Sequence, residues 1–246
     1  MNGSYLMGKA HTMLNCLAHP RLIYKLGRGV IPDTYCRLDT KWMRQFKFDT
    51  ILDIGANIGR FAVTANAVFP SATIYAFEPL PDCYNQTQRV IGKIGRGRAF
   101  NVGLGERNED ITINRNSHSP SSSFLPLAKT HVNAFPFAES KEKIAVKVMR
   151  LDDMAADIPM GASVLVKIDV QGFERAVIAG GTATLAKAKV ILIELSYEEL
   201  YAGQPLFGEV FGLLSGIGFK FVGTLAQMPH PEDGRLLDAD CLFVRA

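Results

Sequence analysis

The fold is decided by Thr50-Ile51-Leu52-Asp53-Ile54-Gly55-Ala56-Asn57-Ile58-Gly59. Its first five residues predict a short buried strand, and Gly55 lets the chain turn sharply after it without a Cβ clash. Over residues 58–69, apolar side chains recur near the 3.6-residue period of a helix, which Pro70 ends. Because open α/β sheets bind ligands beyond the carboxyl ends of their strands, this loop is the first candidate site.

The same alternation of strand and helix continues along the chain. Further strands are expected at 73–77, 98–104, 163–168, 190–195, 219–222 and 241–244, and helices at 82–94, 175–187 (interrupted by Gly180-Gly181) and 207–215. Apolar strands that alternate with helices indicate a mostly parallel sheet covered on both faces. The expected fold class is therefore a doubly wound, Rossmann-like α/β fold.

Two regions fall outside this alternation. Residues 1–48 are expected to form an N-terminal helical cap or extension, ahead of a single domain that spans 49–246. Residues 114–143 form a polar insertion between short strands at 111–113 and 144–149. A stretch of that length without clear periodicity usually marks a functional loop or a mobile segment.

Composition and charge exclude several classes of protein. The net charge is only +3 and no block of like charges occurs, so no nucleic-acid partner is expected. The four cysteines are far apart, which argues against a zinc site and against a disulfide framework. No stretch reaches the roughly 18 apolar residues of a membrane span, and no signal-peptide core is visible. We therefore expect a soluble cytoplasmic protein.

The spacing of glycines and acids around the first loop indicates the ligand. A nicotinamide-binding loop would read Gly-x-Gly-x-x-Gly, whereas this one reads Asp-x-Gly-x-x-x-Gly, from Asp53 to Gly59. A carboxylate suits a ligand with an amino group better than a pyrophosphate. Glu78 ends the next strand, 19 residues after Gly59, where an acid accepts the hydroxyls of a ribose. The alternatives are a plain strand-to-helix turn at the loop and an exposed strand-end charge at Glu78.

Several motifs together resemble a known family. They lie at residues 53–59, 77–79, 101–105, 151–153, 166–174, 193–194 and 200–205. From about Asp49 to its C-terminus the chain resembles the FkbM-type family of class I S-adenosylmethionine-dependent methyltransferases, and the segment 166–174 is the most specific marker. The resemblance implies a seven-stranded sheet whose last strand is antiparallel, with S-adenosyl-L-methionine over the carboxyl ends of the first three strands.

The resemblance also implies which residues hold the cofactor. Those around its methionine portion and ribose come from the first two loops, and those near its adenine follow the second and third strands. The expected cofactor-binding residues are Asp53, Gly55, Ala56, Asn57, Gly59, Glu78, Pro79, Leu80, Asn101, Val102 and Asp169.

The end of the fourth strand carries the expected chemistry. Lys167 and Asp169 point to the same face of a pleated strand. Asp169 is the leading candidate to position an acceptor hydroxyl or to take its proton, with Lys167 and Glu174 as further catalytic candidates. The alternative is a Lys167–Asp169 ion pair that only organises the loop. FkbM-like proteins typically have glutamate where this chain has Gln171, and an amide cannot act as a base.

The acceptor side is less clear from the sequence. Ser121, Ser122, Gln171 and Glu194 are the residues expected to border the substrate, and residues 114–143 are expected to lie nearby. Glu194 adds a third carboxylate, which would suit a divalent metal, but Lys167 would repel the ion, so no metal is expected. The three histidines outside the N-terminal region, His118, His131 and His230, are expected at the surface.

These observations predict an S-adenosylmethionine-dependent methyltransferase. The resemblance, not the spacing of residues, implies that its acceptor is a hydroxyl on a small molecule, a glycan or a natural-product intermediate. N-methylation, a cofactor-binding protein without turnover and, least favoured by the loop spacing, a dehydrogenase remain as alternatives. The apolar, partly aromatic N-terminal segment could pack against a second subunit, so a homodimer is a further expectation.

Overall fold

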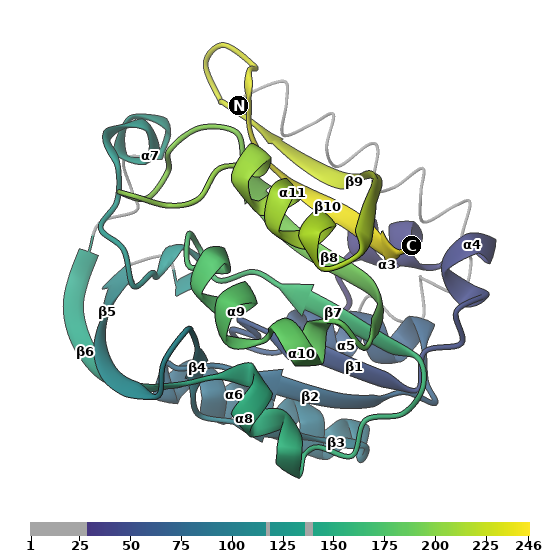
Figure 1. Ribbon diagram of the computed structural model, residues 1–246. Helices are drawn as coiled ribbons and strands as arrows, with labels where there is room; N and C mark the ends of the chain where they lie inside the picture. Colours follow the sequence, from purple (N-terminus) through teal and green to yellow (C-terminus); the bar gives the residue numbers. More distant parts are fainter. Residues whose placement is uncertain (1–28, 117–118, 136–139) are drawn as a thin grey trace.

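The protein is built on one twisted sheet covered by helices on both faces (Figure 1). The computed structural model describes residues 29–116, 119–135 and 140–246. The strands of the main sheet are β1 (Thr50–Ile54), β2 (Thr73–Phe77), β3 (Gly97–Phe100), β7 (Val164–Ile168), β8 (Ala188–Ser196), β9 (Phe219–Pro229) and β10 (Leu236–Arg245). Their order is β3-β2-β1-β7-β8-β10-β9. The last strand, β10, is antiparallel to both of its neighbours, while β3, β2, β1, β7 and β8 pair in parallel. The predicted fold class is confirmed.

The two faces of the sheet form two hydrophobic cores. Successive residues of a strand point to opposite faces, so Ile51 packs in one core and Leu52 in the other. The Ile51 side is covered by α3 (Pro32–Leu38), α5 (Arg60–Val68) and α6 (Pro81–Ile94). The Leu52 side is covered by α8 (Leu151–Met154), α9 (Glu174–Gly180), α10 (Thr182–Leu185) and α11 (Phe207–Gly216). Burial on both faces explains why the strands are almost continuously apolar.

The expected third strand, 98–104, is wrong as one element. It ends at Phe100, and after a bend the chain forms β4 (Gly103–Leu104), which pairs with β6 (Ser140–Met149) instead of the main sheet. β6 also pairs with β5 (Glu109–Asn116), giving a second sheet of order β4-β6-β5. The bend lies at Asn101, whose side-chain amide donates to the carbonyl oxygens of Glu78 and Pro79, 3.0 and 2.9 Å away.

The polar insertion is shorter than its sequence suggested. β5 and β6 extend into it, with Asn114 opposite Lys143 in the antiparallel ladder. Between them lie a 3₁₀ turn (Ser119–Ser121) and α7 (Lys129–Ala134). β9 and β10 are also longer than expected, because their antiparallel ladder continues through polar residues such as Gln227 and Asp240 to a short turn. Hydrophobic periodicity alone did not mark these extensions.

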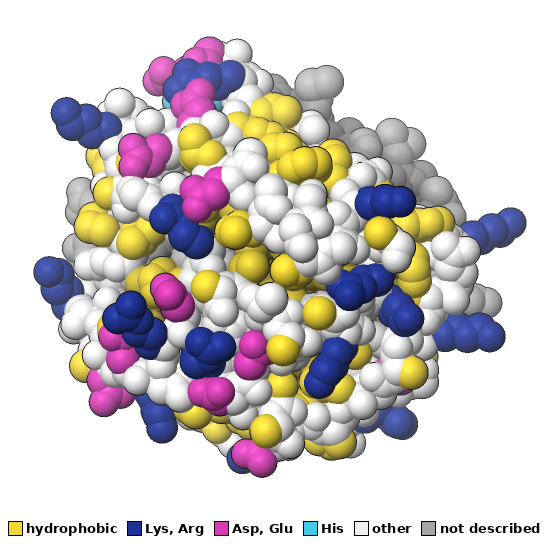
Figure 2. Space-filling view, in the orientation of Figure 1, with side chains coloured by type: hydrophobic (Ala, Val, Ile, Leu, Met, Phe, Trp, Pro, Cys, Tyr) yellow, Lys and Arg dark blue, Asp and Glu magenta, His cyan; other side chains and the backbone are white. Residues whose placement is uncertain are grey.

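The described part of the N-terminal region contributes two short helices that pack on the Ile51 side of the sheet. Residues up to 28 of the expected cap lie outside the described residues, as does His118. From residue 29 the chain forms α3 and α4 (Lys41–Arg44), and the backbone nitrogen of Ile31 donates to Thr64 Oγ1 on α5 at 2.9 Å. In the described ranges, no helix has the length and apolar character needed to cross a membrane. On the face seen in Figure 2, Lys and Arg side chains are spread out and do not form one stripe.

Candidate active site

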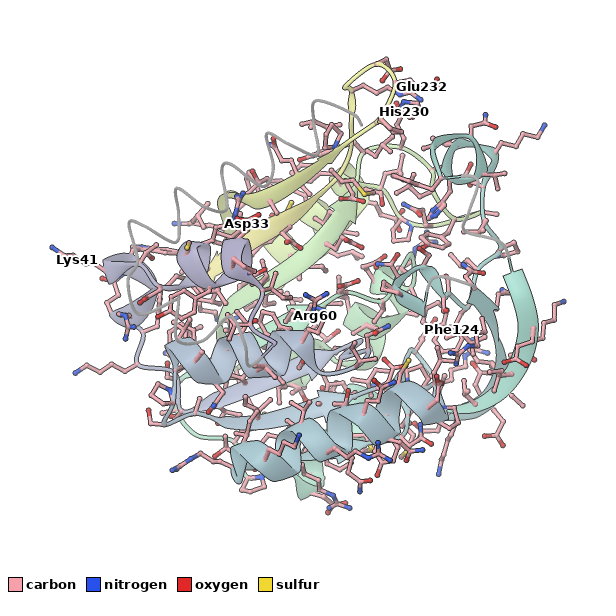
Figure 3. All side chains as sticks on the ribbon, turned by 180° about the vertical axis from the view of Figure 1, so that it is seen from behind. Asp33, Lys41, Arg60, Phe124, His230 and Glu232 are labelled. Atoms are coloured by element: carbon pink, nitrogen blue, oxygen red, sulfur yellow. The ribbon has the colours of Figure 1, made fainter. Side chains whose placement is uncertain are left out.

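A cavity of about 320 Å³ opens where the carboxyl ends of β1, β2, β7 and β8 meet the insertion. Figure 3 shows Arg60, at the start of α5, and Phe124, from the insertion, on two sides of the region, and both line the cavity. The lining brings together predicted residues from five separate segments: Gly55, Ala56, Asn57, Glu78, Pro79, Leu80, Ser122, Lys167, Asp169, Gln171 and Glu194. Six predicted residues lie around the cavity without lining it: Asp53, Gly59, Asn101, Val102, Ser121 and Glu174.

Gly55 brings the first loop against the end of β7. Its φ is +78°, and a Cβ atom there would lie 1.8 Å from the carbonyl oxygen of Asp169. No side chain fits in that space, so glycine is required for the two neighbouring parallel strands to end side by side. As a result, the loop after β1 and Asp169 share one edge of the cavity.

Asp53 is a buried carboxylate with an unfilled hydrogen-bonding capacity. Its side chain is fully buried, and neither oxygen has a hydrogen-bond partner among the described residues. Burial raises the pKa of this carboxyl to about 6, an effect that Lys167 opposes and Asp169 reinforces. An unpaired buried carboxylate is costly, and a ligand that carries an amino group would relieve that cost. Asp53 therefore fits the methionine end of S-adenosylmethionine.

Lys167 lies between two carboxylates on the same edge. Its Nζ is 2.9 Å from Asp169 Oδ2 and 3.9 Å from Asp53 Oδ1, and it sits 5.6 Å from the centre of the Phe61 ring. Burial alone would lower the pKa of this ammonium, but Asp169 and Asp53 raise it above its ordinary value. Lys167 is therefore charged near neutral pH. The Lys167–Asp169 ion pair that the sequence left as an alternative is present.

Glu78 is held by backbone groups on both of its oxygens. The amide nitrogen of Asn57 donates to Oε2 at 2.8 Å, and that of Leu80 donates to Oε1 at 2.9 Å. Each oxygen keeps a lone pair for a further donor. Burial raises the pKa of Glu78 to about 7, although the two backbone donors lower it. An oriented carboxylate at the cavity wall fits the paired hydroxyls of a ribose.

Gln171 joins the two carboxylates on the other side of the cavity. Its amide nitrogen donates to Asp169 Oδ1 at 2.7 Å and to Glu194 Oε2 at 2.6 Å. Its amide oxygen accepts from the Tyr201 hydroxyl at 2.6 Å. The amide thus bridges Asp169 and Glu194, and Tyr201 fixes which end of the amide faces them.

Acids outnumber cations along this edge of the sheet. Asp240 on β10 lies directly opposite Glu194 on β8, and Asp238 lies opposite Ser196. Burial is the main cause that raises the pKa of Asp240 to about 6, of Asp238 to about 7, and of Glu194 well above its ordinary value. Neighbouring carboxylates add to each shift. Such a surplus of negative charge fits a cationic ligand.

Three further predicted residues, Glu174, Ser121 and Ser122, make hydrogen bonds in or beside the cavity wall. Glu174 is buried at the start of α9, its Oε1 accepts from the backbone nitrogen of Gly172 at 3.0 Å, and burial raises its pKa to about 7. The Ser121 carbonyl accepts from the Tyr201 hydroxyl at 3.2 Å. Ser122 Oγ, in the lining, accepts from the backbone nitrogen of Asn116 at 3.1 Å.

Sequence reasoning missed some residues of the site and misplaced others. The residues that were missed are Tyr201, Asp240, Arg60 and Phe124, which contribute side chains to the cavity or its hydrogen bonds, and Tyr201 lay inside a recognised motif without a role.

Two histidines were also misplaced. The surface positions expected for His131 and His230 are wrong, because both are buried. His131 packs between the rings of Phe135 and Tyr201, and burial lowers its pKa.

Comparison with known proteins agrees with this geometry. The protein-family sequence model for the methyltransferase FkbM domain matches residues 53–221 of this chain. The chain is 32% identical over 193 residues to the 2-O-methyltransferase NoeI of Sinorhizobium fredii, covering 76% of this chain and 77% of that protein. It is 31% identical to the 31-O-demethyl-FK506 methyltransferase FkbM of Streptomyces tacrolimicus, in an alignment that covers 71% of this chain and 74% of that protein. The chain is 26% identical to the hexuronic acid methyltransferase AglP of Haloferax volcanii. That alignment covers 60% of this chain and 56% of that protein.

A solved structure matches with lower similarity. The methyltransferase FkbM from Methylobacillus flagellatus KT aligns with a TM-score of 0.49 at 16% identity, covering 80% of this chain. The chain spans less than half of that protein, 44% of its length.

Proposed function

Because the chain belongs to the FkbM methyltransferase family and takes S-adenosylmethionine as its cofactor, we propose that it methylates a hydroxyl oxygen of a small molecule or a glycan. The observation that carries the proposal is the arrangement of one cavity. Glu78 lines one side of it, with Asp53 buried next to that side, and the bridged pair Asp169 and Glu194 lies on the other. The cavity thus offers a cofactor side and a side where carboxylate oxygens can hold a hydroxyl.

The cofactor side is assigned from the contacts of each residue. Asp53 faces the amino group, because its buried oxygens have no partner among the described residues. Glu78 accepts the ribose hydroxyls, and Pro79 and Leu80 lie beside the adenine. Asn101 acts indirectly, because its amide holds the carbonyl oxygens of Glu78 and Pro79.

The residues on the acceptor side align the acceptor hydroxyl with the methyl group and hold it through a charged carboxylate. The bound cofactor supplies an electrophilic methyl group on a positively charged sulfur. Asp169, fixed by Lys167 and Gln171, accepts a hydrogen bond from the acceptor and orients it. Holding the two reactants in line supplies much of the rate. Ser122 and Phe124 close the cavity on the insertion side.

Oxygen is favoured as the acceptor atom by the names of two relatives, a 2-O-methyltransferase and a 31-O-demethyl-FK506 methyltransferase. A glycan is favoured by a third, a hexuronic acid methyltransferase. The amine alternative has its own support, since a surplus of carboxylates also binds an ammonium. An ammonium, however, has no lone pair until it loses a proton, so this site would hold it in an unreactive form.

Three measurements test the proposal. Calorimetry should show binding of S-adenosylmethionine and none of NAD, and absence of the former would refute it. Turnover to S-adenosylhomocysteine should then be followed with methyl β-glucoside, methyl β-glucuronide and the matched amine, methyl β-glucosaminide. We expect product from a hydroxyl probe, and methylation only at the amine would replace the proposal with N-methylation. Extracts from cells with and without the protein should differ in a metabolite by one methylene.

A further inference from the structure

The two carboxylates that Gln171 bridges differ in how their oxygens are used. Asp169 has both engaged, Oδ2 by the Lys167 ammonium and Oδ1 by the Gln171 amide. Glu194 has only Oε2 engaged. Its Oε1 has no partner in the part of the chain that the structure describes, and Glu194 lines the cavity. Glu194 therefore presents an oxygen that no described residue engages, whereas each oxygen of Asp169 already accepts one hydrogen bond and keeps one lone pair for the acceptor.

Gln171 is held in place by more than its side chain. Its φ is +54°, in the left-handed region where a residue other than glycine costs about 1–2 kcal/mol. Its carbonyl oxygen accepts from Ser123 Oγ at 2.5 Å, and its amide oxygen accepts from the Tyr201 hydroxyl at 2.6 Å. Because burial raises the pKa of Tyr201, this hydroxyl stays protonated and remains a donor. The amide nitrogen is thereby kept pointing at Asp169 and Glu194.

We propose that Glu194, through its free Oε1, is the general base of the reaction, and that Asp169 is an orienting residue which stays paired with Lys167. This rests on the proposed function. The acceptor hydroxyl gives its proton to Oε1 while its oxygen forms the bond to the methyl carbon. The carbon–sulfur bond breaks, its electron pair stays on sulfur, and the sulfonium charge is lost. Glu194 ends neutral and returns the proton to water.

The charges around Glu194 suit this role. Asp169 follows β7, Asp238 and Asp240 face it from β10, Glu174 begins α9, and burial together with these acids raises its pKa well above the ordinary value. Lys167, which also lies on this edge, pairs with Asp169. A base is most effective when its pKa lies near the working pH, and the raised pKa of Glu194 suits that role. Gln171 keeps one oxygen of Glu194 in place through a neutral donor.

The test combines a direct titration with kinetics. Protein labelled with ¹³C at the glutamate side-chain carboxyl is titrated by NMR with S-adenosylhomocysteine bound, and the Glu194 signal is assigned by its loss in Glu194→Gln. We expect Glu194 to take up its proton at a clearly higher pH than an ordinary exposed glutamate, because burial and the neighbouring acids raise its pKa. A Glu194 signal that titrates like that of an exposed glutamate overturns the proposal. This readout needs no acceptor, so it distinguishes failure of the base from failure of the proposed reaction.

The kinetic part uses the methyl β-glucoside and methyl β-glucuronide probes. Glu194→Gln should lower kcat at least about 100-fold. It should also abolish the acid limb of the pH profile, which is the fall of kcat at low pH as the base becomes protonated. The variant should still bind S-adenosylmethionine with wild-type affinity and keep its thermal melting transition. Asp169→Asn should keep the acid limb and raise KM. Asp240→Asn is the matched control: it should keep the limb and move it to lower pH, because a like charge is removed. Loss of the limb in Asp169→Asn but not in Glu194→Gln would assign the base to Asp169 instead.

Discussion

Asp53 and Lys167 lie side by side on β1 and β7, yet the lysine Nζ stops 3.9 Å from Asp53 Oδ1, beyond hydrogen-bond distance. The ammonium is drawn instead to Asp169, 2.9 Å away. Asp53 is consequently a buried carboxylate without a hydrogen-bond partner among the described residues. We attribute this to its proposed role, in which the amino group of the cofactor completes it.

Asp53→Asn should therefore stabilise the free protein and weaken cofactor binding. The folded pKa of Asp53 is raised from 3.8 to about 6, so its ionised form opposes folding, and this penalty appears as pH rises from about 4 through about 6. At pH 7.5 the variant should gain on the order of 2 kcal/mol and about 5 °C in Tm, while near pH 4 the gain disappears. Thermal melting at both pH values checks this.

The control for Asp53→Asn is Asp110→Asn, at an exposed position on β5. It should change neither the melting temperature nor the affinity. Calorimetry should show S-adenosylmethionine binding to Asp53→Asn at least about tenfold more weakly. An Asp53→Asn protein that binds the cofactor as tightly as wild type would contradict the assignment.

Glu78→Gln should remove recognition of the ribose. The wild-type protein should bind S-adenosylhomocysteine at least about tenfold more tightly than its 2′-deoxy analogue, because a hydrogen bond to a charged group contributes about 1.5–3 kcal/mol. In the variant, the two affinities should converge. The comparison is between ligands within one protein, so a general loosening of the Asn57–Leu80 backbone would not mimic it. An unchanged ratio would place the ribose elsewhere.

Gly55→Ala should disrupt the junction of β1 and β7. The matched control is Gly95→Ala at the end of α6, which has a similar φ, +72° against +78°, but no atom within 4 Å of an added Cβ. Gly95→Ala should cost about 1 kcal/mol from backbone strain alone. Gly55→Ala should cost at least about 2 kcal/mol more, since the Asp169 carbonyl must move. Equal losses in urea unfolding would mean that the close approach is unimportant.

The sequence predicted the parts of the fold that depend on local patterns. The apolar runs at β1, β2, β7 and β8 and the helical periods between them were sufficient for the parallel sheet. The path after Phe100 was not predictable in the same way, because β4 is defined by its partner β6, more than forty residues along the chain. Long-range pairing, not periodicity, decides such a segment.

The same distinction between local patterns and long-range pairing applies to the residues of the site. Asp53, Glu78, Lys167 and Asp169 follow strand ends and could be identified from position. The partnership of Gln171 with Tyr201 joins residues 30 apart, and Asp240 reaches Glu194 only through the antiparallel pairing of β10. Sequence reasoning judged Gln171 by what an amide cannot do, which is to accept a proton. The structure shows what it does, which is to donate to two acids at once.

Gln171→Glu should therefore raise the pH needed for activity. A third carboxylate would replace the bridging donor, and like charges raise one another's pKa. Because the proposed base works in its ionised form, the acid limb of the kcat profile should move to higher pH by at least about one unit. At a pH well above the limb, kcat should recover to within about tenfold of wild type. Turnover of the hydroxyl probes across the pH range measures both effects.

The control for Gln171→Glu is Tyr201→Phe, which removes the hydroxyl that orients the amide but adds no charge. It should lower kcat at all pH values, because the amide can then turn its oxygen toward Glu194, and it should leave the acid limb nearer its wild-type position. If Gln171→Glu lowers kcat equally at every pH, the amide serves only to pack the loop. A shift of the limb that Tyr201→Phe does not share would instead tie the protonation of the site to the charge at position 171.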